Sequence, residues 1–132
     1  MSDMKISKFN TENDARRALI DACLQMNVLS INQGKSGNAS VRWDRGLEDG
    51  LLITPSAVPY EQLQVDDIVW ISMRLQGQGD QARPARRDEG CEPSSEWRMH
   101  RDIYALRDDA QAVVHTHGIE SCRPLPFKMK GV

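Results

Sequence analysis

Residues 112–117, Ala-Val-Val-His-Thr-His, constrain the fold more than any other stretch of this chain. Apolar residues lead into two histidines at alternate positions, and alternation is the side-chain period of a β-strand. His115 and His117 are therefore expected on the same side of a strand. Two imidazoles that project together are typical of half of a metal site, because neutral imidazole is a good zinc ligand.

The rest of the chain predicts helices and strands in mixed order. Thr11, followed by acidic residues, is a typical helix start, and apolar residues then recur at helical spacing to about Val28. Further expected elements are a hairpin from 41–43 and 51–54, a short helical stretch at 60–63, strands at 67–73 and 112–117, and a helix starting within 93–107. Residues 32–40 and 74–92 are glycine-rich and polar, which predicts loops.

These elements show no clean βαβ repeat, so an antiparallel sheet is favoured over a parallel one. The predicted fold class is α/β (α+β-like), with a central, largely antiparallel sheet flanked by helices. The chain of 132 residues has the size of a single domain, residues 1–132. The residues of the second helix that are available for the core are Trp97, Ile103, Tyr104 and Leu106.

Charge and cysteine content exclude several classes of protein. The formal net charge of −2 gives no electrostatic reason to expect nucleic acid or a membrane as a partner. Three widely spaced cysteines indicate neither a disulfide framework nor a zinc knuckle. The polar N-terminus lacks the apolar segment of a signal peptide, and no apolar run is long enough to span a membrane. We therefore expect a soluble, cytoplasmic protein.

Glu96 and His100 are further candidates for chemistry. One helical turn separates them, so they share a helix face. His100 is either a third metal ligand or a histidine tied into the fold. Glu96 is either a partner of the helix dipole or, beside a metal, a ligand or general base.

Small polar residues in three loops suit phosphate binding, since backbone N–H groups, hydroxyls and a helix N-terminus all favour an anion. They are Gly34, Gly37 and Asn38 in the first loop, Ser56 in the second, and Ser94 and Ser95 at the start of the second helix. We expect residues 34–40, 55–58 and 93–96 to converge on one anion-binding pocket. The arginines at 83, 86 and 87 are expected to be solvated charges in a polar loop.

Four ordered motifs resemble the class II aldolase/adducin family over roughly residues 14–122. They read INQGKSGNASVR (31–42), LITPSAVPYEQL (52–63), PSSEWRMH (93–100) and AVVHTH (112–117). Related pentulose-phosphate epimerases carry aspartate where this chain has Glu96, so the glutamate favours the aldolase branch.

The resemblance implies a zinc-dependent lyase that cleaves a ketose 1-phosphate to dihydroxyacetone phosphate and an aldehyde such as lactaldehyde. His115 and His117 would be zinc ligands. Glu96 would be the catalytic acid/base and would touch the metal when substrate is absent. The implied phosphate-binding residues are Asn38, Ser56, Ala57, Ser94 and Ser95. Zinc would act as a Lewis acid. His100 matches a family position that is not a metal ligand. The resemblance also implies a homotetramer.

Three departures from the family are visible. Family members commonly have glycine at Ala57, which matters if that turn needs positive φ. The family aldolase has threonine at Ser56, which keeps the hydroxyl. Residues 123–132 do not match the family's continuation, in which the third zinc histidine lies. We therefore expect a domain incomplete at its C-terminus, with weak zinc binding and little turnover.

Two other functions stay open. The chain could be a non-catalytic product, either a truncated fragment or an interaction module in the manner of adducin. It could also be an epimerase or dehydratase of the same family that acts on another sugar phosphate. Retention of Glu96, His115 and His117 favours an enzymatic ancestor.

Overall fold

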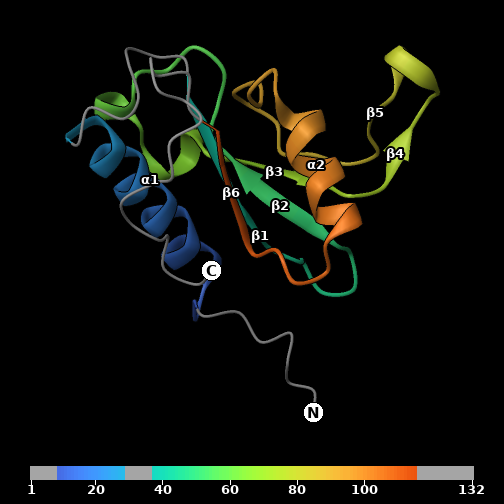
Figure 1. The fold of residues 1–132 in the computed structure, drawn as a ribbon, viewed down its shortest axis with the longest axis horizontal. Helices are drawn as coiled ribbons and strands as arrows, with labels where there is room; N and C mark the ends of the chain where they lie inside the picture. Colours follow the sequence, from blue (N-terminus) through green and yellow to red (C-terminus); the bar gives the residue numbers. More distant parts are fainter. Residues whose placement is uncertain (1–8, 29–36, 116–132) are drawn as a thin grey trace.

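The computed structural model describes residues 9–28 and 37–115. In it, a four-stranded sheet with one helix on each face forms the body of the molecule (Figure 1). The strand order is β3 (Val69–Ser72), β2 (Gly50–Ile53), β1 (Asn38–Arg42) and β6 (Ala112–His115). Every pairing between these strands is antiparallel. The predicted α/β class with an antiparallel sheet is confirmed.

The two faces of the sheet carry two separate cores, because side chains alternate along each strand. Helix α1 (Glu12–Val28) packs Leu19 and Met26 against Val41, Leu52 and Trp70 on one face. Helix α2 (Trp97–Leu106) packs against the other face, where Tyr104 joins the side chains that point to the opposite side of the same strands, Leu51, Ile53, Val69 and Ile71. Neither described helix is long and apolar enough to cross a membrane.

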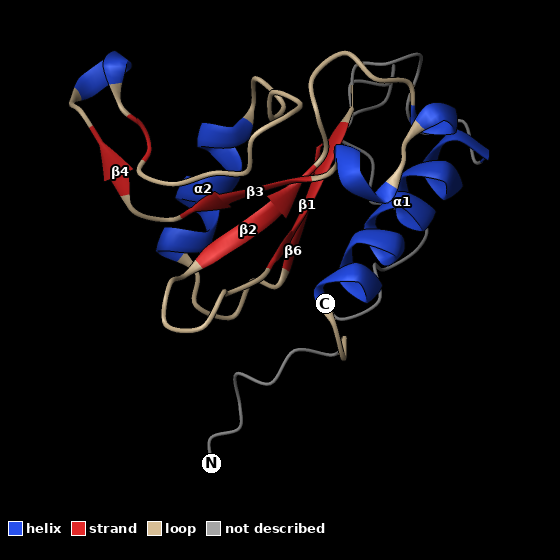
Figure 2. Ribbon diagram, turned by 180° about the vertical axis from the view of Figure 1, so that it is seen from behind, coloured by secondary structure: helices blue, strands red, loops and turns tan. Residues whose placement is uncertain are grey.

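Several predicted boundaries are wrong. The first loop ends earlier than expected, because Asn38 already pairs with His115 as the first residue of β1. The expected loop 74–92 contains a small ribbon, β4 (Leu75–Gln76) with β5 (Arg83–Pro84), which extends away from the main sheet (Figure 2). Leu106 does not join the core, since it is 82% exposed. The predicted strand residues 116–117 and the divergent tail 123–132 lie outside the described residues.

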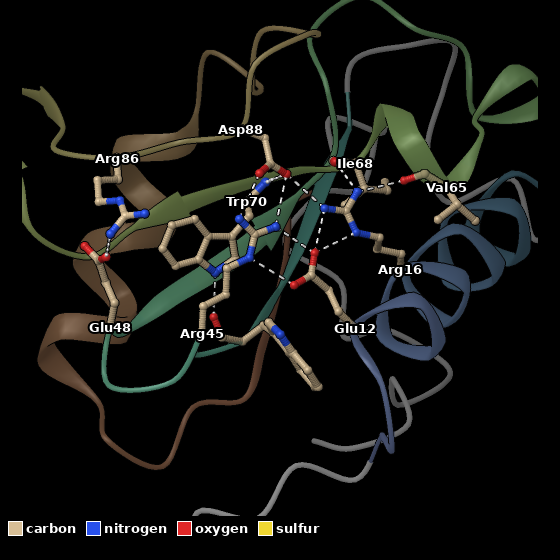
Figure 3. A network of polar contacts seen from close by, with 10 residues as sticks. Glu12, Arg16, Arg45, Glu48, Val65, Ile68, Trp70, Arg86 and Asp88 are labelled. Carbon is tan, nitrogen blue, oxygen red and sulfur yellow. Dashed lines mark hydrogen bonds and ion pairs between the residues drawn. The ribbon is translucent and has the colours of Figure 1, made fainter.

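A network of arginines and carboxylates joins α1, the β1–β2 hairpin and the segment after β5 (Figure 3). The Arg16 guanidinium donates to Glu12 at 2.8 Å and to Asp88 at 2.9 Å. It also donates to the backbone oxygens of Val65 and Ile68, at 2.8 and 2.6 Å. Arg45 donates to the same two carboxylates and lies over the Trp70 ring. The network therefore ties α1 to the β1–β2 hairpin, to residues 65–68 and to the segment after β5.

This network makes stability depend on pH. Hydrogen bonds from Arg45 hold the pKa of Glu12 below its ordinary value of 4.5, although burial opposes them. The unfolded chain therefore takes up a proton at higher pH than the folded chain, so this stabilisation is complete above about pH 4.5 and is lost as the pH falls further.

We expect the urea midpoint to drop below that pH, and to drop less steeply in Glu12→Gln. Asp21→Asn, an exposed change on the same helix, is the control. A steeper acid loss in Glu12→Gln than in the unaltered chain would contradict this interpretation.

Candidate active site

The topology brings the candidate residues to one end of the sheet. Because β1 runs antiparallel to both β2 and β6, the start of β1 lies beside the ends of its two neighbours. Asn38 begins β1 and His115 ends β6, directly opposite each other and on the α2 face. Glu96 immediately precedes α2. Chain segments far apart in sequence thus present polar side chains at the same end of the sheet.

Two of the three predicted phosphate loops lie side by side. Pro55 and Pro93 form a β-bridge, and the Ser94 N–H donates to the Thr54 oxygen at 2.9 Å. The Ser56 N–H in turn donates to the Glu92 oxygen at 2.9 Å. Residues 55–56 and 92–94 are thereby held as a pair.

An open cleft of about 720 Å³ lies over these paired loops. Its polar lining includes Ser56, Ser95 and Glu92 together with three arginines, Arg83, Arg87 and Arg98. Asn38 does not line this cleft and is 4% exposed. The structure therefore brings the second and third predicted loops together, whereas Asn38 lies at the start of the inner strand β1, beneath α2, and Gly34 lies outside the described residues.

The expectation of solvated arginines holds for Arg83 and Arg86, which are exposed, whereas Arg87 is half-buried. Arg87 donates to the Cys91 oxygen and to Glu92, and Arg98 donates to the Ala82 oxygen at 2.9 Å. Arg86 pairs with Glu48. Arg98 thereby ties α2 to residues 79–82, and the cleft has three cations, Arg83, Arg87 and Arg98, beside the Glu92 carboxylate. Sequence reasoning missed Arg98, because nothing in its helical position indicates which loop it reaches.

Ala57 adopts a left-handed backbone conformation, with φ of 65°. A side chain at this conformation costs about 1–2 kcal/mol, whereas glycine adopts it without strain. The turn therefore does have a positive φ at residue 57. This is the condition under which the replacement of the family's glycine by alanine matters. Ala57 is exposed, so its methyl group is not required for packing.

We expect Ala57→Gly to raise the free energy of unfolding by about 0.5–1 kcal/mol, because the relief of strain exceeds glycine's greater freedom in the unfolded chain. Ala105→Gly is the matched control, since Ala105 is exposed within α2. There the same change should destabilise by about 1 kcal/mol. Urea denaturation measures both, and equal effects of the two substitutions would contradict the assignment of strain to residue 57.

Glu96 and His115 come together at the end of the sheet. The Glu96 Oε1 and His115 Nδ1 atoms are 4.0 Å apart, and both side chains are about one-third exposed. Zinc holds oxygen and nitrogen ligands at about 2.0–2.2 Å, so two of its ligands are separated by less than roughly 4.3 Å. In the usual tetrahedral arrangement two such ligands lie roughly 3.4 Å apart, so the pair would have to close by a few tenths of an ångström to hold one zinc ion together. His117 lies outside the described residues, and residues 9–28 and 37–115 contain no group of three metal-ligating side chains.

His100 is buried in a hydrogen-bond chain that sequence reasoning missed. Its Nδ1 atom lies 2.7 Å from Ser40 Oγ, which lies 2.8 Å from the Tyr104 hydroxyl, and its Nε2 atom is hydrogen-bonded to Asn38 Oδ1. Burial, together with the nearby His115, lowers the pKa of His100 to about 4. His100 is therefore neutral at pH 7. Of the two interpretations of His100, the histidine tied into the fold is favoured over the third metal ligand. The alternation of Asn38 with Ser40, and the helical spacing of His100 and Tyr104, are signals that could have revealed the chain.

Comparison with known proteins finds matches over most of the chain. The model of the Class II Aldolase and Adducin N-terminal domain matches residues 17–122. An L-fuculose phosphate aldolase of Escherichia coli O6:H1 is 43% identical over 120 residues, covering 86% of this chain and 49% of that protein. A 5-methylthioribulose-1-phosphate/5-deoxyribulose-1-phosphate aldolase of Rhodospirillum rubrum is 44% identical over 117 residues, covering 84% and 47%.

The fold agrees with the sequence matches. A solved structure of L-fuculose 1-phosphate aldolase is similar with a TM-score of 0.62 at 30% identity, covering 80% of this chain and 45% of that one. An aldolase II superfamily protein from Pseudomonas syringae has a TM-score of 0.66 at 20% identity, a likeness of fold alone. The chain spans about half the length of these relatives.

Proposed function

Since the chain belongs to the class II aldolase and adducin family, we propose that its described residues form part of a zinc-dependent lyase site for ketose 1-phosphates. The reaction breaks the C3–C4 bond of the ketose and yields dihydroxyacetone phosphate and an aldehyde. The observation that carries the proposal is the approach of Glu96 and His115 beside two serine-bearing loops at one end of the sheet. A homotetramer and a cytoplasmic location are parts of the proposal.

Phosphate binding is assigned to the paired loops. Backbone N–H groups at Ala57 and Ser95 and the hydroxyls of Ser56, Ser94 and Ser95 are donors of the kind that phosphate takes. The Ser94 hydroxyl accepts from the Glu96 N–H at 3.1 Å, so its own proton is left to donate. Arg83, Arg87 and Arg98 make the cleft favourable for a dianion. Holding the phosphate fixes the reacting carbons relative to Glu96.

Glu96 is assigned the proton transfer at C3. After the C3–C4 bond breaks, its carboxyl group returns a proton to C3 of the dihydroxyacetone phosphate half, and in the reverse direction the carboxylate removes that proton. His115, His117 and, without substrate, Glu96 would hold the metal. Zinc, when bound, supplies a Lewis acid that stabilises negative charge on the ketose oxygens.

The relatives differ in the aldehyde part of their named substrates, and we propose L-fuculose 1-phosphate as the substrate over 5-deoxyribulose 1-phosphate. The identities to the two kinds of relative are close, 43% and 44%, so the order of preference rests on the structural match to L-fuculose 1-phosphate aldolase. Parallel cleavage assays of the two ketose phosphates decide between them.

The proposed function is tested by proton exchange at C3 of dihydroxyacetone phosphate, a half reaction that needs no aldehyde. The chain is incubated with dihydroxyacetone phosphate, excess Zn²⁺ and D₂O, and loss of a C3 proton signal is followed by NMR. We expect exchange that depends on zinc. Binding of dihydroxyacetone phosphate without exchange would favour a non-catalytic member of the family, and failure to bind it would contradict the phosphate assignment.

A further inference from the structure

The strongest unassigned feature is the buried chain Tyr104–Ser40–His100–Asn38. All four side chains are at most 4% exposed, and they connect the first residue of β1 to α2. Nothing in the proposed chemistry uses His100, Ser40 or Tyr104. Buried polar side chains are costly unless their hydrogen bonds are satisfied, so each donor in such a chain has a defined direction.

The directions follow from the end of the chain. The amide oxygen of Asn38 can only accept, so His100 Nε2 carries the proton and donates it. In a neutral imidazole the other nitrogen then accepts, which requires the Ser40 hydroxyl to donate to Nδ1. With its own proton used, Ser40 Oγ accepts from the Tyr104 hydroxyl. The chain thus runs in one direction, from Tyr104 to the Asn38 oxygen.

This direction has a consequence for Asn38. A carboxamide is planar, and its oxygen and nitrogen leave the same carbon on different sides. When the oxygen is held by His100, the NH₂ group cannot face His100 and presents its N–H bonds elsewhere. Rotation of the carboxamide by 180° would place two donors, the NH₂ group and Nε2–H, against each other.

We propose that His100 is a positioning residue that fixes the carboxamide of Asn38 so that its NH₂ group donates to the substrate phosphate. The inference rests on the proposed function, and it adds to that function the phosphate role that the family resemblance implies for Asn38. His100 does not touch the phosphate in this account and acts only through Asn38. Ser40 and Tyr104 hold the tautomer that this role requires.

The first test reads the tautomer in the unaltered chain. Long-range ¹H–¹⁵N NMR of the histidine rings at pH 7 distinguishes Nε2–H from Nδ1–H. We expect His100 as the neutral Nε2–H form. A neutral Nδ1–H ring, or a ring protonated on both nitrogens, would overturn the proposal without reference to any activity.

The second test uses two matched variants and inorganic phosphate as the probe. The amide nitrogen of glutamine lies near the place of Nε2, so His100→Gln keeps a donor for Asn38, whereas the shorter His100→Asn imitates the Nδ1 side and loses that donor. Both variants bury one amide in place of the ring, and urea denaturation checks that both are folded. We expect His100→Asn to weaken phosphate binding about tenfold, the effect of one hydrogen bond to a charged group, and His100→Gln to stay within about twofold of the unaltered chain.

The Asn38→Ala variant distinguishes phosphate binding by Asn38 from the positioning role of His100. If Asn38→Ala leaves phosphate affinity unchanged, the assignment of Asn38 to phosphate fails whatever the His100 tautomer is. If Asn38→Ala weakens binding but His100→Asn and His100→Gln have equal affinities, the positioning role is wrong and the assignment of Asn38 stands.

Discussion

Replacing Arg16 with methionine is expected to lower the free energy of unfolding by about 3 kcal/mol, the lower end of the range for removing one partner of a buried ion pair. The Arg16 side chain is 8% exposed and satisfies two carboxylates and two backbone oxygens. Methionine has similar length but no donor, so the oxygens of Val65 and Ile68 lose their hydrogen bonds inside the protein. Arg45 still contacts Glu12 and Asp88, which keeps the loss from being larger.

Arg17→Met is the matched control, because Arg17 is the next residue of the same helix and is exposed. We expect that variant to unfold within about 0.5 kcal/mol of the unaltered chain, as is usual for surface changes. Urea denaturation measures both. Equal midpoints for the two variants would show that the network in Figure 3 contributes little to stability.

Replacing Glu96 with glutamine is expected to slow zinc-dependent proton exchange of dihydroxyacetone phosphate by about 10²–10⁴-fold, the usual contribution of a general acid or base. Glutamine has nearly the same shape but cannot take up or release the proton. The N–H of residue 96 still donates to Ser94 Oγ in the variant, because that hydrogen bond involves only the backbone of Glu96. Phosphate affinity should therefore change by less than about threefold, which distinguishes a catalytic loss from a collapsed site.

Glu92→Gln controls for carboxylate charge near the substrate, since Glu92 is exposed and lines the cleft over the paired loops. Its exchange rate should stay within about threefold of the unaltered chain. A Glu92→Gln variant as slow as Glu96→Gln would mean that cleft charge, and not proton transfer by Glu96, controls the reaction.

Local patterns predicted the parts of the fold that depend on few residues. The helical spacing from Ala15 to Met26 predicted α1, and the apolar run into the alternate histidines 115 and 117 predicted a strand over 112–117, of which β6 is the described part. The two-residue strands β4 and β5 were missed, because an element that short has no period to detect. The positive φ at Ala57 was raised as a question only because family members commonly have glycine there, since alanine itself gives no signal of a left-handed turn.

The sequence could not predict contacts between residues that lie far apart along the chain. Arg16 meets Asp88 across 72 positions of sequence, and His100 meets Asn38 across 62. Those contacts require the strand register and the placement of both helices on the sheet. The approach of Glu96 to His115, whose Oε1 and Nδ1 atoms are 4.0 Å apart, was expected only because the family resemblance makes both residues zinc ligands.

The central claim is that separate loops at one end of the sheet form one phosphate site next to Glu96. Titration of the ¹⁵N-labelled chain with dihydroxyacetone phosphate, followed by amide NMR, tests it most directly. The account predicts that the largest shifts occur together, with a single affinity, at the backbone amides of Ser56, Ala57 and Ser95 and at the side-chain amide of Asn38. Shifts confined to one of these loops, or centred elsewhere in residues 9–28 and 37–115, would contradict it.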